Sequence, residues 1–121
     1  MTARSLVIKI TAGKDDPERC NQAFNVAAAA TVSGVPVSLW LTGEASWFAL
    51  PGRAADFSLP HAPPLADLLA SVLSGGTVSL CTQCAARRGI TVDDVHPAVR
   101  IAGAASFVAE VLADDAQALV Y

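Results

Sequence analysis

Short apolar segments alternate along the chain with longer segments whose apolar residues recur every three or four positions. The short segments are rich in β-branched side chains and bounded by turn-forming residues, which is typical of buried strands. The longer ones predict helices that each bury one apolar face, and Asp16, Pro17 and Gly34 suit the two ends of the first helix. Strands are predicted at 5–10, 35–41, 77–80, 99–102 and 118–121, and helices at 17–33, 45–50, 65–74, 83–88 and 104–113.

The order of these elements predicts an α/β fold with three layers. Strands and helices alternate with short connections, and the strands are apolar throughout, which favours a sheet covered by helices on both faces. We therefore expect a five-stranded, mostly parallel sheet, with the last helix turning Phe107, Val108, Val111 and Leu112 inward. In such sheets ligands and catalytic groups gather beyond the carboxyl ends of the strands.

Length and composition indicate one domain that self-associates. The chain has 121 residues and is 53% hydrophobic, which is enough for a single core over residues 1–121. Only 16% of the residues are charged. A monomer would then leave apolar surface exposed, so we expect a homo-oligomer.

The charge pattern and the hydropathy argue against nucleic-acid and membrane partners. The net charge is -3, and Arg87 and Arg88 form the one basic cluster, which is too little for a phosphate-backbone footprint. No apolar stretch reaches the roughly 18 residues that span a bilayer. The first ten residues also lack the cleavage site of a signal peptide. We expect a soluble cytoplasmic protein with reduced thiols.

The Cys-x-x-Cys pair is the main candidate for chemistry. Cys81 follows the third predicted strand and precedes a short helix, whose free N–H groups and dipole would favour the reactive thiolate. Cys84 lies one turn further on, where it could close a disulfide with Cys81 or resolve a persulfide formed there. Cys20 lies on the apolar face of the first helix and is expected to act as a small buried hydrophobe.

Four other residues are candidates for the wall of a substrate pocket. In the irregular, proline-rich segment 42–64, Trp47 is expected to line a cleft or a subunit contact. His61, from the same segment, is expected to assist the ionisation of the strand-end cysteine. Arg87 and Arg88 would either stabilise the end of their short helix, which we favour, or contact an anionic substrate.

No metal or cofactor is expected. Structural zinc takes four ligands, and the chain has no second Cys-x-x-Cys, while His61 and His96 lie far apart in sequence. A zinc site shared between subunits is the alternative that stays open. The TAGKDD segment, Thr11–Asp16, lacks the remaining residues of a phosphate-binding P-loop, and no Gly-x-Gly-x-x-Gly follows a strand.

Taken together, these features resemble the DsrE/DsrF-like family. The resemblance rests on the order of the elements, the PPLADLL helix from Pro63, the GGTVSLC run into Cys81, the RRGI segment and the closing ALVY strand. It covers nearly the whole chain. The family includes the sulfur-relay subunit TusD and small stand-alone members with a Cys-x-x-Cys pair.

The resemblance implies a five-stranded parallel α/β fold that assembles into trimers or hexamers. In the sulfur-relay subunits a cysteine after the third strand, eight residues before the glycine of an Arg-Arg-Gly segment, carries a persulfide sulfur. Cys81 and Gly89 match these positions. Cys84 corresponds to the second cysteine of the stand-alone members and departs from the relay subunits, which keep one.

This departure leaves three functions open. In the first, the chain is a DsrE-like sulfur carrier, sulfurtransferase-like if active, in which Cys81 accepts a persulfide sulfur and Cys84 resolves it; protein thiols would donate and accept the sulfur. In the second, the pair is a dithiol redox centre. In the third, the chain is a non-enzymatic oligomeric binding module whose cysteines only pack.

Overall fold

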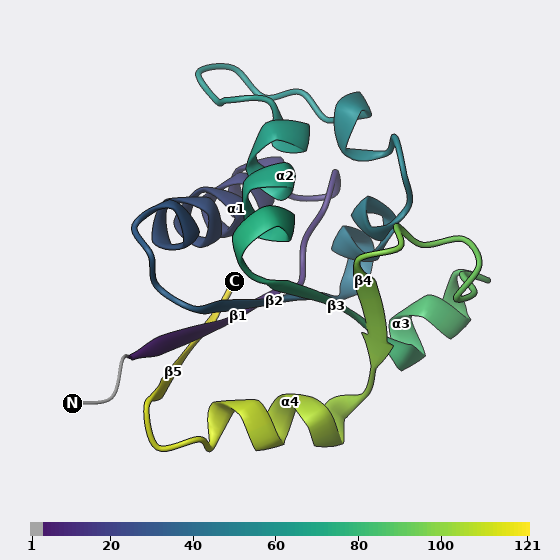
Figure 1. Cartoon of the computed structure of the whole chain (residues 1–121). Helices are drawn as coiled ribbons and strands as arrows, with labels where there is room; N and C mark the ends of the chain where they lie inside the picture. The colour runs from purple at the N-terminus through teal and green to yellow at the C-terminus, as the bar shows by residue number, and fades with distance from the viewer. Residues whose placement is uncertain (1–3) are drawn as a thin grey trace.

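Five parallel strands form one sheet in the computed structural model, which describes residues 4–121. The strand order is β4-β3-β2-β1-β5, and every neighbouring pair is parallel (Figure 1). The strands are β1 Ser5–Ile10, β2 Val37–Leu41, β3 Thr77–Cys81, β4 Val99–Ala102 and β5 Ala116–Val120. The helices are α1 Pro17–Val32, α2 Leu65–Gly75, α3 Thr82–Arg87 and α4 Ala104–Val111, with two 3-10 helices, η1 Gly43–Ala49 and η2 Ala54–Asp56.

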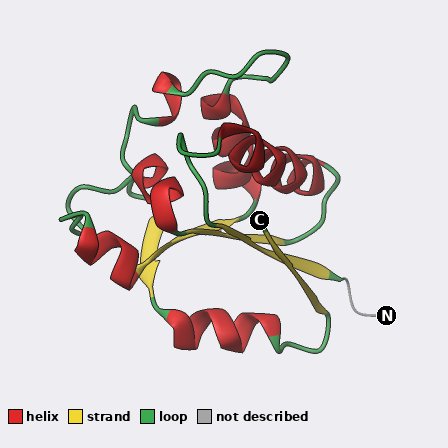
Figure 2. Cartoon of the chain, turned by 180° about the vertical axis from the view of Figure 1, so that it is seen from behind, coloured by secondary structure: helices red, strands yellow, loops and turns green. Residues whose placement is uncertain are grey.

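Helices cover both faces of the sheet, so the predicted three-layer α/β fold is confirmed. The α1 and α2 helices lie together on one face, and α4 lies alone on the other, as Figure 2 shows from behind. The strands turn apolar side chains toward the core on the α1/α2 side. Its strand side chains are fully buried at Ile8, Ile10, Leu39, Leu41 and Leu80.

The α1 helix begins and packs as its sequence predicts. Asp16 is its N-cap and accepts a hydrogen bond from the Arg19 N–H at 3.4 Å, and Pro17 occupies the first turn. Phe24, on the apolar stripe, is fully buried and meets Phe48 of η1 edge-to-face, with ring centroids 5.9 Å apart. Aromatic contacts of this geometry fix the position of η1 on the helix layer.

The sheet face under α4 is polar, and the prediction that the strands are apolar throughout is wrong there. The Glu110 carboxylate of α4 accepts hydrogen bonds from Ser38, from Trp40 Nε1 at 3.2 Å and from Arg100. Arg100 also donates to the buried Ser79 hydroxyl at 2.6 Å. These bonds tie the single covering helix to three strands of the sheet.

This network also sets which side of α4 faces the sheet. We expected Val108 and Leu112 to point inward, but their side chains are 49% and 75% exposed. Glu110 and Phe107 turn toward the sheet instead, because Arg100 and Trp40 offer a charged partner and an aromatic face there. The predicted orientation of Val108 and Leu112 is therefore wrong.

The segment between β2 and α2 contains two 3-10 helices instead of one short helix at 45–50. Gly43 opens η1 with a φ of +54°, a region that side chains other than glycine rarely adopt. A Cβ at Gly43 would stand 2.3 Å from the Thr11 carbonyl oxygen. Glycine therefore lets η1 pack directly against the end of β1.

Candidate functional site

Cys81 is at once the last residue of β3 and the N-cap of α3. Its backbone is extended, and α3 begins at Thr82, so no loop separates the strand from the helix. The residue lies at the carboxyl edge of the sheet, paired in register with Ala102 of β4. The side chain is half-buried. The predicted position at a strand end and a helix start is confirmed.

The surroundings of Cys81 favour its thiolate. Partial burial raises the pKa of the thiol, but several groups act in the opposite direction and the net pKa is below its ordinary value. These groups are the N–H and the thiol of Cys84, the N–H of Gln83 and the positive charge of Lys9. A lower pKa means a larger thiolate fraction near neutral pH, and the thiolate is the nucleophile.

A small cavity of about 70 Å³ opens beside Cys81 on the α4 side of the sheet. Its walls include Lys9, Trp40, Thr42 and Phe107. The Lys9 ammonium stands 5.2 Å from the centroid of the Phe107 ring, a cation–π distance. Since roughly 15 Å³ is enough to hold a water molecule, the cavity has room for an added sulfur atom.

Sequence reasoning missed Lys9 as part of this site. A lysine in the middle of an otherwise apolar strand was the available signal. Its meaning depended on the register, because β1 pairs Lys9 with Trp40 of β2. That pairing brings the ammonium to the face that Cys81 shares.

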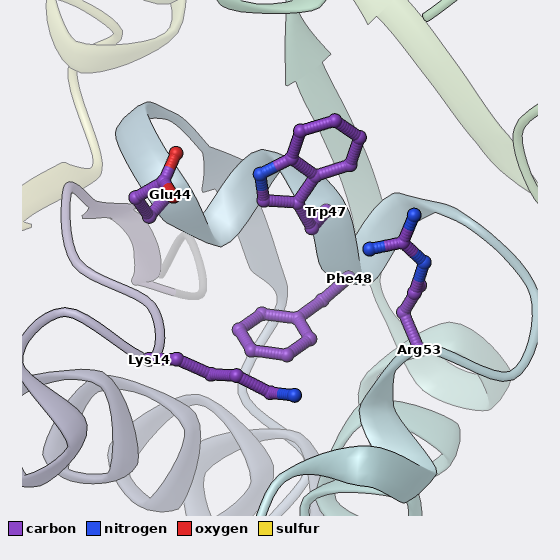
Figure 3. A pocket seen from close by; sticks show the side chains of 5 residues that line it. All are labelled: Lys14, Glu44, Trp47, Phe48 and Arg53. Carbon is purple, nitrogen blue, oxygen red and sulfur yellow. The ribbon is translucent and has the colours of Figure 1, made fainter. Parts of the chain in front are cut away.

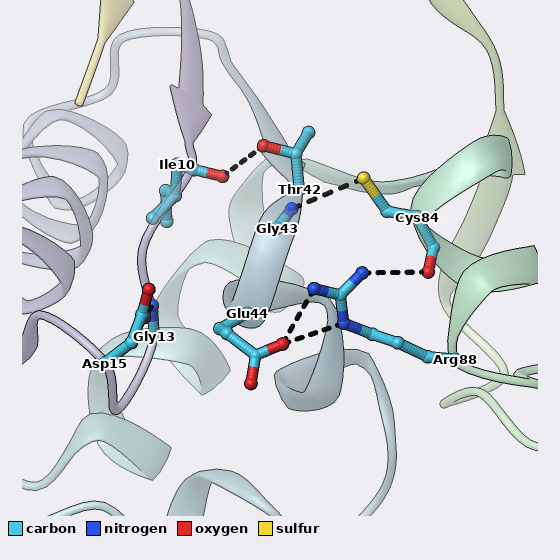
Figure 4. Close-up of polar contacts among 8 residues, drawn as sticks. All are labelled: Ile10, Gly13, Asp15, Thr42, Gly43, Glu44, Cys84 and Arg88. Carbon is cyan, nitrogen blue, oxygen red and sulfur yellow. Dashed lines mark hydrogen bonds and ion pairs between the residues drawn. The ribbon is translucent and has the colours of Figure 1, made fainter.

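Cys84 is the inner thiol of the pair. It is buried, and its Sγ accepts a hydrogen bond from the Gly43 N–H at 3.3 Å, which Figure 4 shows. All three cysteines are free thiols. A donor would therefore meet Cys81 first, while Cys84 lies one helical turn behind it.

Arg88 joins the end of α3 to the start of η1. Its guanidinium donates two hydrogen bonds to Glu44 Oε2, from Nε at 2.9 Å and from Nη2 at 2.7 Å, and a third from Nη1 to the Cys84 carbonyl at 3.2 Å (Figure 4). Two charge-assisted hydrogen bonds that converge on one carboxylate oxygen restrain the guanidinium. Arg88 thus positions the Cys84 turn, whereas Arg87 is exposed in the last turn of α3.

Trp47 and His61 lie apart from Cys81. Trp47 lines a second cavity, formed with Lys14, Glu44, Phe48 and Arg53 and drawn in Figure 3. His61 is exposed beside α1, among Glu18, Asn21 and Gln22, in the loop that passes over the helix layer away from α3 (Figure 1).

The expectation that His61 assists Cys81 is therefore wrong. The buried Phe57 and the half-buried Leu59 anchor the loop on the apolar α1/α2 side, which carries the imidazole away from the carboxyl edge. Lys9 supplies the positive charge near Cys81 instead.

Cys20 contrasts with the Cys-x-x-Cys pair. It is fully buried on α1, and burial, together with the charges of Asp15 and Asp16, raises its pKa to about 12. Such a thiol stays protonated and unreactive at neutral pH. The expectation that Cys20 only packs agrees with this position.

Residues 4–121 contain neither a cluster of metal ligands nor a membrane-spanning helix. They contain no group of three or more His, Cys, Asp or Glu side chains placed to hold a metal ion. They also contain no helix that is long and apolar enough to cross a membrane.

The fold and the site define the class of the protein: a small parallel α/β domain with a cysteine at the end of a central strand. The sequence profile described as the DsrE/DsrF-like family matches residues 4–118, and the chain belongs to this family. No curated protein sequence matches the chain.

Several solved structures share the fold. The YchN protein from E. coli is 20% identical, with a TM-score of 0.80, covering 98% of this chain and 99% of that one. MTH1491 from Methanobacterium thermoautotrophicum, a protein of unknown function, is 11% identical with a TM-score of 0.71 and the same coverage of both chains. BT1422 from Bacteroides thetaiotaomicron is 17% identical with a TM-score of 0.60, covering 98% and 95%. At these identities the likeness establishes the fold.

Proposed function

We propose that this chain is a sulfur carrier with sulfurtransferase-like activity that uses Cys81. The observation that carries the proposal is the half-buried Cys81 thiol at the start of α3, with a lowered pKa and Lys9 beside it. Family membership supports the same reading. Reduced thiols suit a reducing compartment such as the cytoplasm.

The transfer step needs no external oxidant. The Cys81 thiolate attacks the outer sulfur of a donor persulfide, R–S–S⁻. The donor S–S bond breaks, a new S–S bond forms at Cys81, and R–S⁻ leaves with the electron pair. A partner thiolate then takes the outer sulfur from Cys81 by the same exchange. Lys9 offsets the negative charge of the bound perthiolate in the adjoining cavity.

Cys84 offers the Cys81 persulfide a second reaction besides transfer to a partner. Its thiol passes its proton to the outer sulfur of the Cys81 perthiolate, and the resulting Cys84 thiolate attacks the inner, Cys81 sulfur. The S–S bond of the persulfide breaks, a Cys81–Cys84 disulfide forms, and HS⁻ leaves with the electron pair. The closeness of Cys84, one turn along α3, favours this step. The same disulfide would serve the second candidate function, a dithiol redox protein.

Mass spectrometry of the intact protein tests the carrier function. Treatment with inorganic polysulfide should add about 32 Da, one sulfur atom, to Cys81. Cys81→Ser should lose the adduct, Cys84→Ser should retain it longer, and Cys20→Ser should behave like the unaltered chain.

An unmodified Cys81 under conditions that label a known carrier would reject the function. If a Cys81–Cys84 disulfide forms with glutathione disulfide while no sulfur adduct is ever seen, the redox function is favoured.

We also propose that the chain self-associates through the α4 side, as a trimer or hexamer. Val108, Leu112 and Val120 are large apolar side chains that lie 49%, 75% and 64% exposed. Such side chains are costly to leave in water when they adjoin one another. Light scattering should give a mass above that of the monomer, and Leu112→Glu should lower it. A monomer in both proteins would contradict self-association and leave the thiol chemistry untouched.

A further inference from the structure

The cavity around Trp47 is built from η1 and the loops beside it at the carboxyl edge of the sheet, separate from the Cys81 cavity. Lys14 follows β1, and Glu44, Trp47 and Phe48 follow β2, so the walls come from two neighbouring strand ends. Ligands of open parallel sheets bind in crevices at this edge. The volume is about 230 Å³. A dry cavity of roughly 150 Å³ already accepts benzene, so this one fits a one- or two-ring molecule.

The walls combine aromatic faces with cationic side chains. Phe48 forms a buried wall and Trp47 is half-buried beside it. The Arg53 guanidinium lies over the Trp47 ring, with its Cζ 4.8 Å from the ring centroid (Figure 3). A cation–π contact restrains the guanidinium without using its N–H groups as hydrogen-bond donors, so they can still bind a carboxylate in bidentate fashion.

The charge of this cavity is positive once its ion pairs are counted. Glu44 is the one acidic wall residue, and its carboxylate is neutralised by Arg88. Within residues 4–121, neither Lys14 nor Arg53 has a carboxylate within 4.0 Å. The acids next to Lys14 in sequence are engaged elsewhere: Asp15 accepts from the Gly13 N–H at 2.7 Å, and Asp16 pairs with Arg19.

We propose that this cavity binds a small planar aromatic carboxylate. Its ring would lie against Phe48 and Trp47, and its carboxylate would be held by Arg53 and Lys14. The site does not depend on the sulfur chemistry of Cys81. Its wall residue Glu44 also carries the Arg88 pair that positions Cys84, so the two sites share one structural support.

Two-dimensional ¹H–¹⁵N NMR of the full chain tests the proposal with indole-3-carboxylate as the probe and indole-3-carboxamide as its neutral match. Trp40 provides an internal reference, because its indole N–H is buried on the opposite side of the sheet, against Glu110. The carboxylate should shift the Trp47 indole N–H signal and leave that of Trp40 in place, with a dissociation constant of roughly 1 mM or tighter. Trp47→Phe assigns the two signals.

The remaining measurements test whether binding depends on the charge of the ligand and of the cavity. The carboxamide and the Arg53→Gln variant should each weaken binding about tenfold, as loss of a charge-assisted pair does. Lys14→Gln should weaken binding less, and Arg87→Gln, an exposed arginine outside the cavity, should leave it unchanged. Equal binding of the carboxamide, or no Trp47 shift with the carboxylate at 10 mM, about ten times the expected constant, overturns the proposal. Polysulfide labelling of Cys81 in the Arg53→Gln protein should stay normal, so failure of this site and failure of the carrier function are separable.

Discussion

The two faces of the sheet are built for different purposes. The α1/α2 face is apolar, and two helices and the aromatic contacts of η1 cover it. The α4 face carries Lys9, Ser79 and Arg100 under a single helix that contributes no fully buried residue. Cys81 opens onto this second face. The comparison teaches that the first face stabilises the fold, which leaves the second free to hold charge beside the Cys81 thiol.

The largest loss of stability should come from removing a buried side chain on the apolar face. Phe24→Ala removes a fully buried ring and should lower the free energy of unfolding by about 3–5 kcal/mol. Phe107→Ala, on the half-buried α4 side, should cost less than about 2 kcal/mol. Urea denaturation measures both. Equal losses would show that the two faces contribute alike, against the comparison.

A substitution at Gly43 tests how tightly η1 packs against the end of β1, at the carboxyl edge of the sheet. Gly43→Ala places a Cβ 2.3 Å from the Thr11 carbonyl oxygen at a positive φ, and should cost about 2–3 kcal/mol. Gly89→Ala is the control, since its φ is +65° and its Cβ would meet open space. It should cost about 1 kcal/mol. A similar loss at both positions would mean that the contact with Thr11 is not tight.

Glu110 should make the α4 face sensitive to acid. Burial raises the pKa of this carboxyl, but hydrogen bonds from Ser38, Trp40 and Arg100, and the Arg100 charge, bring it below the ordinary value of 4.5. A carboxyl with a lowered folded pKa stabilises the protein above its unfolded pKa, and this contribution is lost as pH falls through the folded pKa.

Removing the Glu110 charge checks this pH dependence. Glu110→Gln should lower the free energy of unfolding at pH 7 by about 1–3 kcal/mol, and flatten its fall below pH 4.5. Thermal unfolding measured from pH 7 to pH 3 gives this pH dependence of stability, because Asp and Glu carboxylates, with an ordinary pKa of about 4, protonate in that range. Asp93→Asn is the control, because that carboxylate is exposed and forms no ion pair within residues 4–121. A parallel fall in the unaltered and Glu110→Gln proteins would exclude Glu110 as the acid-sensitive group.

The smallest expected effect concerns Lys9 and the reactivity of Cys81. Lys9 lowers the pKa of Cys81 through its charge, so Lys9→Met should slow alkylation of Cys81 at pH 7 about two- to fivefold. Lys14→Gln, a lysine at the other cavity, should not change the rate. Iodoacetamide labelling followed by peptide mapping gives both rates. An unchanged rate in Lys9→Met would leave the α3 start as the sole cause of the lowered pKa.

The sequence predicted those features that depend on local pattern. Apolar β-branched runs placed the strands, and the position of Cys81 at the end of one run placed its sulfur at the start of α3. The parallel arrangement followed from helices that alternate with strands. The family resemblance is confirmed over residues 4–118.

Features that depend on contacts between distant segments escaped sequence reasoning. Lys9 joins Cys81 only through the register of β1 with β2. Helical periodicity alone favoured the more apolar side of α4, whereas Glu110 turned inward because Ser38, Trp40 and Arg100 lie opposite it. His61 was placed by sequence proximity to β3, but Phe57 and Leu59 hold its loop on the helix layer.

The direct join between β3 and α3 has a mechanical consequence. Cys81 belongs to the backbone ladder of the sheet and is the N-cap of a helix at once, so no loop lets its backbone move between positions. In the proposed carrier function, a sulfur anchored in this way would not travel between donor and acceptor. Both molecules would dock at the same place in turn, and the surface around the carboxyl edge would accommodate each of them.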